Sequence, residues 1–232
     1  MPVVPVALSR LGIEETSREP QNARAVTWLL GQPGGPIVVI TPRKDFSSEI
    51  LTRLVAQPGV VHRTWRAFNA SSFNRQRVVY AWPDRKHLND VWTTEADALV
   101  VIEWNEDETA EWISDARPIQ LLAEGTAQVP EQEKSAALES LPNGIDSILE
   151  YVAQMAVGYS SGLKWNEEDK LKADMMNRPE RWLPVTVAQV RAKCRQLGMS
   201  PKDADTIADF VQRRKDGRRF NVRSSYRTFH FK

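Results

Sequence analysis

Basic and aromatic residues are concentrated at the carboxyl end of the chain. Residues 213–232 hold eight Lys or Arg against a single acid, Asp216. Because the whole chain has a formal net charge of +1, this segment carries +7 and the rest of the chain −6. Clustered cations between rings suit a phosphate backbone and its bases. The residues predicted to contact nucleic acid are Arg213, Arg214, Lys215, Arg218, Arg219, Phe220, Arg223, Tyr226 and Arg227.

The same segment has two other interpretations. Residues 95–115 contain eight acids and no Lys or Arg, so the basic segment has a candidate docking surface on its own chain or on a second copy. Residues 221–231 also alternate in polarity enough to form a strand. The sequence leaves open whether the segment meets external nucleic acid or docks within the protein or between subunits.

Charged residues also follow predicted strands in the first half of the chain. Ligands of open α/β sheets bind outside the carboxyl ends of the strands. Pairs of cations beside the starts of helices suit an anion, and phosphate is the natural one. The alternative is that they are solvated loop charges, with Ser47 and Asp84 capping helices. The predicted phosphate-binding residues are Arg43, Lys44, Ser47, Arg85 and Lys86.

Acids follow a third predicted strand. Glu103 lies in its last residues, and Asn105 and three further acids come next. Carboxylates beside basic loops would suit Mg²⁺. However, Asn105 is a good helix cap, and acids in a first helical turn interact favourably with its positive end. We therefore predict neither a metal nor another cofactor, and Glu103 is the one ligand to be considered.

Short runs rich in Val and Ile predict a sheet in the first half of the chain. They are too short and too β-branched for buried helices, and helix-like stretches separate them. This alternation predicts an open, mostly parallel, Rossmann-like sheet with helices on both faces, over residues 24–130. Residues 1–23 are predicted to be a loosely docked leader. The predicted strands are 25–30, 36–41, 60–65, 77–82, 98–104 and 119–123, and the helices are 47–56, 85–92 and 106–115.

Residues 131–216 predict a smaller, all-helical region. Apolar residues recur at helical spacing from Ile145 to Tyr159, and Asn166 is a candidate cap for the next helix. Thr186 begins a capping-box pattern, and Ser200 precedes a helix that starts at a proline. Residues 217–232 are the basic aromatic tail.

The last two predicted helices resemble the helix-turn-helix of bacterial repressors. Cys194, Gly198 and Ala204 stand where a small residue, a turn glycine and an apolar residue fix the helix crossing. The resemblance implies that the second helix reads DNA. Three aspartates on that helix would repel phosphates, so a hairpin that serves only packing is the alternative.

Residues 37–45, IVVITPRKD, are followed by a predicted helix and then by residues 96–104, ADALVVIEW. This order resembles a core of the RecA-like domains of helicases, in which a strand ending in Thr-Pro-Arg precedes one ending in acids. Residues 31–36, GQPGGP, lack the Gly-Lys-Ser/Thr sequence that holds phosphates in P-loop ATPases. We therefore do not expect an ATPase of that class.

The composition is that of a globular protein, with 41% hydrophobic and 26% charged residues. The single cysteine, Cys194, excludes an intramolecular disulfide and fits a reducing compartment. No segment approaches the roughly 20 apolar residues of a membrane span. We expect a cytoplasmic protein without a membrane partner.

Three functions are compatible with the sequence. The leading hypothesis is nucleic-acid-associated binding through the basic tail and the hairpin, because the clustered cations and rings of the tail suit a polyanion. No arrangement such as Ser-His-Asp indicates an enzyme. The second is an enzyme acting on a nucleotide or phosphorylated metabolite at the strand ends, with Arg43 and Lys44 holding phosphate and Glu103 acting as base or metal ligand. The third is an assembly protein, a homo-oligomer in which the tail docks on the acidic residues 95–115 of a partner subunit.

Overall fold

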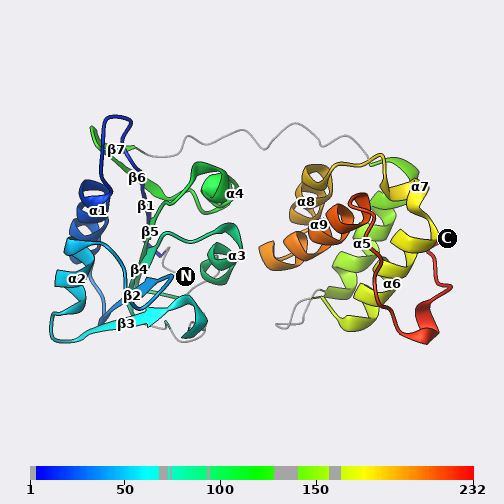
Figure 1. Ribbon diagram of the computed structural model, residues 1–232, viewed down its shortest axis with the longest axis horizontal. Helices are drawn as coiled ribbons and strands as arrows, with labels where there is room; N and C mark the ends of the chain where they lie inside the picture. Colours follow the sequence, from blue (N-terminus) through cyan, green and yellow to red (C-terminus); the bar gives the residue numbers. More distant parts are fainter. Residues whose placement is uncertain (1–3, 68–72, 74, 93–94, 128–140, 157–162) are drawn as a thin grey trace. The chain divides into compact units, whose positions relative to one another are not determined.

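The computed structural model describes residues 4–67, 73, 75–92, 95–127, 141–156 and 163–232. The chain forms two compact units, Met1–Glu131 and Gln132–Lys232. The first contains a sheet and helices, and the second is helical (Figure 1). This confirms the predicted class, an α/β fold followed by a helical C-terminal region.

The α/β unit is built on one sheet, in which the described residues form seven strands in the order β3-β2-β4-β5-β1-β6-β7. Neighbouring strands are parallel except β7, which pairs antiparallel with β6. Strands β2 and β5 are buried at every residue, which explains their continuous apolar sequences. The strands are β1 (Val6–Ser9), β2 (Ile37–Thr41), β3 (Val60–Thr64), β4 (Arg77–Ala81), β5 (Ala98–Ile102), β6 (Ile119–Leu122) and β7 (Gly125–Ala127).

Helices cover both faces of this sheet (Figure 1). Helices α1 (Glu19–Leu30) and α2 (Glu49–Val55) lie on one face, and α3 (Arg85–Leu88) and α4 (Glu106–Ala116) lie on the other. Successive strand residues point to opposite faces, so Val100 packs with the first pair of helices and Val101 with the second. The sheet is thus the middle layer of three.

Two predictions for the N-terminal part are wrong. The described part of the predicted leader, residues 4–23, is not loosely docked, because β1 lies between β5 and β6 with Ala7 and Leu8 fully buried. Residues 25–30 are not a strand but the second half of α1. Ala25 and Leu29 lie on one helical face against the sheet, and so short an apolar run fits a buried helix as well as a strand.

The connections that follow the neighbouring parallel strands β1 and β5 lead to opposite edges of the sheet. The connection from β1 passes through α1 to β2, beyond β5 and β4, whereas the connection from β5 passes through α4 to β6, beyond β1. Helices α1 and α4 cover opposite faces (Figure 1). The carboxyl ends of β1 and β5 therefore form the topological switch point, where doubly wound sheets bind ligands.

The helical unit has a core of its own, drawn from every helix in its described part. The capping box of Thr186 and Gln189 and the cap at Ser200 are present as predicted. Asn166 is not a cap, because the helix begins one residue earlier, at Trp165. The helices are α5 (Ile145–Ala156), α6 (Trp165–Asn177), α7 (Pro179–Trp182), α8 (Val187–Gln196) and α9 (Pro201–Lys215).

The segment after α9 lies on the helices of its own unit. It forms no strand in its described residues, only a single 3-10 turn at Ser224–Tyr226. The buried ring of Phe220 packs edge-on against the ring of Phe210, with 5.6 Å between the ring centroids. The rings of Phe231 and Tyr151 pack in the same way at the same centroid distance. Backbone bonds add to this docking, since the Phe231 N–H donates to Asp174 Oδ1 at 2.8 Å. The predicted strand at residues 221–231 is therefore wrong, and the tail is part of the helical unit.

Candidate functional site

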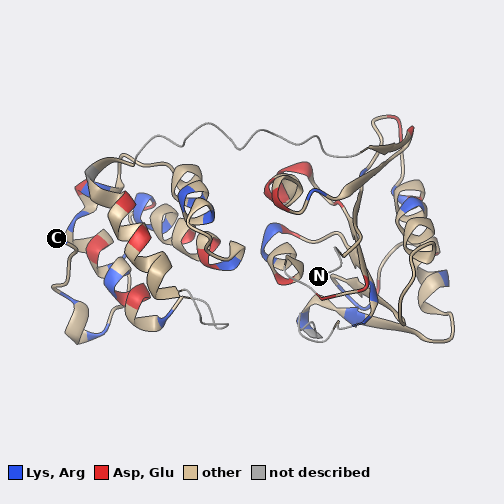
Figure 2. Ribbon diagram, turned by 180° about the vertical axis from the view of Figure 1, so that it is seen from behind, with Lys and Arg blue, Asp and Glu red and all other residues tan. Residues whose placement is uncertain are grey.

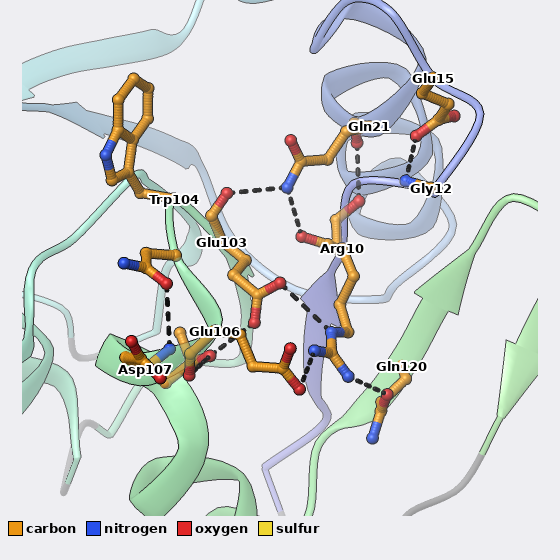
Figure 3. A network of polar contacts seen from close by, with 12 residues as sticks. Arg10, Gly12, Glu15, Gln21, Glu103, Trp104, Glu106, Asp107 and Gln120 are labelled. Carbon is orange, nitrogen blue, oxygen red and sulfur yellow. Dashed lines mark hydrogen bonds and ion pairs between the residues drawn. The ribbon is translucent and has the colours of Figure 1, made fainter.

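Polar side chains of the protein itself fill the topological switch point (Figure 3). Arg10, which follows β1, donates from Nε to Glu103 Oε2 at 3.2 Å and pairs through Nη2 with Glu106 at 2.8 Å. Glu103 follows β5 and is only 7% exposed. Its other oxygen accepts a 2.5 Å bond from the Thr109 hydroxyl of α4. Burial lowers the pKa of Arg10, but the two carboxylates more than offset this and the net pKa is raised.

Gln21 of α1 ties the two strand ends together. Its side-chain amide donates to the carbonyls of Ser9 and Glu103, both at 2.8 Å, and the Ser9 hydroxyl donates back to the Gln21 carbonyl at 2.7 Å. Arg18 adds 2.9 Å bonds to the carbonyls of Glu103 and Trp104 and lies over the Trp104 ring at 4.2 Å. The carbonyls that end β1 and β5 are therefore bonded within the chain.

The chemistry of this network is that of a structural ion pair. Both oxygens of the Glu103 carboxylate already have partners, Arg10 and Thr109, which a metal ion would have to displace. In the described part of the chain, no three residues among His, Cys, Asp and Glu are grouped to hold a metal. The residue types of Arg10, Arg18 and Gln21 gave no sequence signal, because their partners are about 80 to 90 positions away.

The predicted phosphate-binding residues are only partly brought together. Strands β2 and β4 are neighbours, so the loops that follow them lie at the same edge of the sheet. Arg43, Lys44 and Lys86 are exposed there. Arg85 pairs instead with Glu111 of α4, and its N–H donates to Glu108 Oε2 at 2.6 Å. Helices α2 and α3 are too short to offer an anion a strong positive end.

The two predicted caps at this edge differ in outcome. Asp84 caps α3 as expected, accepting from the His87 N–H at 2.8 Å. Ser47 does not cap α2, because its neighbour Ser48 is buried and accepts from the Leu51 N–H at 3.2 Å. Ser47 itself is exposed. The cap lies one residue later than predicted.

His62 of β3 holds the loop that follows β2. The Thr41 hydroxyl donates to the Arg43 carbonyl at 2.6 Å, and its oxygen lies 2.7 Å from His62 Nε2. A hydroxyl has one proton to donate, so the proton of the second bond must be on His62 Nε2. Burial, and then the charge of Lys44, lowers the pKa of His62. A neutral His62 is sufficient for this contact.

The C-terminal segment, residues 217–232, has two sets of side chains, one packed on the helices and one exposed. Its buried or half-buried residues are largely apolar and pack on the core of the helical unit, as Phe220, Val222 and Phe231 do. Its cations remain outside, and Figure 2 shows them recurring along the segment. Phe220 is therefore not available to stack on a base, contrary to prediction. The exposed cations are Arg218, Arg219, Arg223, Arg227 and Lys232.

The first three predicted contact residues have structural partners on the helical unit. Arg213 lies 3.7 Å from Asp209 and packs over the Phe220 ring. Arg214 donates to the carbonyls of Met175 and Arg218, and Lys215 donates to the Leu183 carbonyl at 2.8 Å. Arg213 and Arg214 thus anchor the segment to the end of α9, and Lys215 ties α9 to the residue after α7. The outward cations further along are the better candidates for an external anion.

A tryptophan that the sequence analysis did not single out joins this surface. Trp165, the first residue of α6, is 60% exposed, and the guanidinium carbon of Arg223 lies 3.1 Å from its ring centroid. Arg223 Nε also pairs with Asp169 at 2.5 Å. The two residues of this stack are 58 positions apart, so periodicity offered no signal. A groove of about 370 Å³ beside them is lined by Trp165, Glu168, Asp169, Asn221, Val222 and Arg223.

The helix-turn-helix-like hairpin is present, with Gly198 in the left-handed conformation at its turn. However, a recognition helix must offer one face to a groove, and the face of α9 that is not buried carries Asp209, which is 60% exposed, and Asp205, which pairs with Arg191 at 2.8 Å. Carboxylates on this face repel phosphates, which favours the packing interpretation. Burial, with the nearby Asp203 charge, also raises the pKa of Cys194 to about 12, so its thiol is inert.

Comparisons with known proteins found no match to a family model, to a curated protein or to a solved structure. None of the helices in the described residues has the length and apolar character needed to cross a membrane. Inference about function therefore depends on the two sites themselves.

Proposed function

We propose that this protein binds nucleic acid through the outward cations of its C-terminal segment. The observation that carries the proposal is the sorting of that segment, whose rings anchor it while its cations face solvent. Of the described residues, no Asp or Glu forms an ion pair with Arg218, Arg219, Arg227 or Lys232. Docking thus holds a row of unneutralised cations in place, which suits a polyanion.

The distribution of charge between the two units supports this proposal. Residues 132–232 contain 18 Lys and Arg against 13 Asp and Glu, whereas residues 1–131 contain 13 against 17. Figure 2 shows acids gathered on α4 of the α/β unit. A polyanion is attracted to the helical unit and repelled by the other, so the C-terminal segment is the favoured surface for contact.

The α/β unit offers less support for an enzyme. Its topological switch point is occupied by Arg10, Arg18 and Glu103, which bond to one another and to the strand ends. The docking of the tail on its own helices likewise offers less support for an assembly function, because the segment that would reach a partner subunit is already packed. Nucleic-acid binding requires neither a vacant cleft nor a free tail.

The proposal is tested by fluorescence anisotropy with a labelled oligonucleotide at several salt concentrations. Four phosphate contacts predict a slope of log affinity against log salt of about −3 to −4. Replacing Arg218 and Arg219 with Ala should weaken binding to every sequence and reduce that slope by about 1 to 2. Arg53→Ala is the matched control, because Arg53 is 70% exposed but lies on α2 of the acidic unit. Absence of salt-sensitive binding would refute the proposal.

A further inference from the structure

Trp165 is an exposed tryptophan whose ring stacks against the guanidinium of Arg223. It begins α6 and remains 60% exposed although the Arg223 guanidinium lies over its ring. An exposed indole leaves apolar area in water, and its coverage by a ligand is favourable. Tyr226, whose hydroxyl donates to Asn166 Oδ1 at 3.2 Å, places a second ring 5.4 Å from the same guanidinium. The three side chains form an ordered aromatic and cationic surface.

The groove beside Trp165 has the polarity for a small planar group. It is shallow and open to solvent, so such a group would lie on its surface. Its two acids are neutralised, because Asp169 pairs with Arg223 at 2.5 Å and Glu168 pairs with Lys172 at 2.8 Å. Asn221 contributes an exposed amide, which both donates and accepts hydrogen bonds. A nucleobase combines a flat apolar face with such a polar edge.

A second arginine–tryptophan stack in the protein shows which feature matters. Trp104 is 57% exposed and lies under Arg18 at 4.2 Å, so its exposure and its cation match those of Trp165. Three acids follow each tryptophan, at positions 106–108 and 167–169. Among those after Trp104, only Glu106 forms an ion pair in the described residues, whereas all three after Trp165 pair with cations, and three further exposed arginines accompany Arg223 in the C-terminal segment. Phosphates are attracted to the second surroundings and repelled by the first. Of these two tryptophans, Trp165 is therefore the one suited to a base that is attached to a phosphate backbone.

We propose that the nucleic acid bound by this protein is single-stranded and that one of its bases stacks on Trp165. This inference rests on the proposed nucleic-acid binding and specifies the class of strand. Bases in a duplex are already stacked and paired, so their faces are not available to an indole. In a single strand, the stacking of one base on an aromatic side chain adds to the phosphate contacts and tolerates any sequence.

The test compares three labelled probes with the full-length protein. They are an oligothymidine of about 15 nucleotides, close to the site size of a single-stranded-binding fold, its duplex with oligoadenosine, and an abasic strand of the same length. Trp165→Ala should weaken binding of the oligothymidine about tenfold and leave the other two probes unchanged within about twofold. Trp104→Ala, the matched control, should leave all three unchanged.

Trp165→Phe separates stacking from a loss of structure, because phenylalanine retains an aromatic ring. This variant should keep most of the affinity for oligothymidine but lose the tryptophan fluorescence quenching that binding produces in the unsubstituted protein. Thermal unfolding of each variant shows whether the helical unit is intact.

The outcomes separate the two proposals. The stacking inference is overturned if Trp165→Ala binds oligothymidine as tightly as the unsubstituted protein. It is also overturned if the substitution lowers the affinity for the abasic strand as much as the affinity for oligothymidine. In both cases salt-sensitive binding would still support the proposed function. If the unsubstituted protein binds the duplex more tightly than the single strand, the inference is also overturned. If none of the three probes binds even at low salt, both proposals are refuted.

Discussion

Arg10 and Glu103 close the carboxyl edge of the sheet with a bond of 3.2 Å between residues 93 positions apart. Each follows one of the two strands, β1 and β5, whose connections leave in opposite directions. The position where a doubly wound sheet binds ligands is thus used to hold the sheet together. We propose that this ion pair stabilises the α/β unit and that the helical unit carries the binding surface.

We expect Glu103→Ala to destabilise the α/β unit by about 3 kcal/mol, because it leaves Arg10 and Thr109 without their buried acceptor. Glu106→Ala is the matched control. Glu106 pairs with the same arginine but is 73% exposed, so its removal should cost less than about 1 kcal/mol. Urea unfolding followed by circular dichroism measures both free energies. Equal costs would contradict the structural role of Glu103.

Gly35→Ala should destabilise the α/β unit by about 3 kcal/mol, because an added Cβ would lie 2.1 Å from the Arg75 carbonyl oxygen. That backbone has little room to move, since the Gly35 N–H donates to Asp97 at 2.8 Å and its carbonyl accepts from Arg77 at 3.0 Å. Gly31→Ala places its Cβ in ordinary contact at 3.4 Å and should be neutral. Thermal unfolding midpoints compare the two, and a neutral Gly35→Ala would contradict the close approach.

The stability of the α/β unit should fall as the pH drops below 6.5, the ordinary pKa of histidine, because of His62. Its pKa is lowered in the folded protein, so the unfolded chain binds the proton first as the pH falls and is favoured there.

Lys44→Gln should raise the pKa of His62, because the charge of Lys44 is one of the two causes that lower this pKa. Arg63→Gln should leave the pKa of His62 unchanged. NMR titration of the imidazole proton measures both. An unchanged pKa in Lys44→Gln would contradict the proximity of the two residues.

Phe220→Ala should destabilise the helical unit by about 3 kcal/mol, because the ring is buried against Phe210 and its loss leaves a cavity. Arg227→Ala, which changes an exposed residue of the same segment, should change the free energy of unfolding by less than about 0.5 kcal/mol. Chemical unfolding distinguishes a docked segment from a free one. Equal, negligible effects would show that the segment is not packed on the helices.

The sequence predicted the elements whose side-chain pattern is local. The β-branched runs of β2 and β5 and the Thr186 capping box each lie within a few residues and required no knowledge of the fold. Strand β1 was missed because four residues beside prolines give a weak pattern, and its burial depends on neighbours far along the chain. The run 25–30 was misassigned because so short an apolar run has the same composition in a helix and in a strand.

The candidate sites were harder to predict than the fold for the same physical reason. The charge of the C-terminal segment is visible in the sequence, but the burial of Phe220 is set by Phe210 and by the core of the helical unit. The contacts of Arg223 with Trp165 and of Arg10 with Glu103 join residues 58 and 93 positions apart. Spacing within a segment does not report such contacts, which arise only when the chain folds.

The proposed function is the binding of a polyanion by the docked, outward cations of the C-terminal segment. Its most direct test is the salt dependence of oligonucleotide affinity for the unsubstituted protein and for the variant in which Arg218 and Arg219 are both alanine. We predict a steep slope that becomes shallower by about 1 to 2 in the variant. Identical slopes in the two proteins, or no binding by either, would contradict the claim.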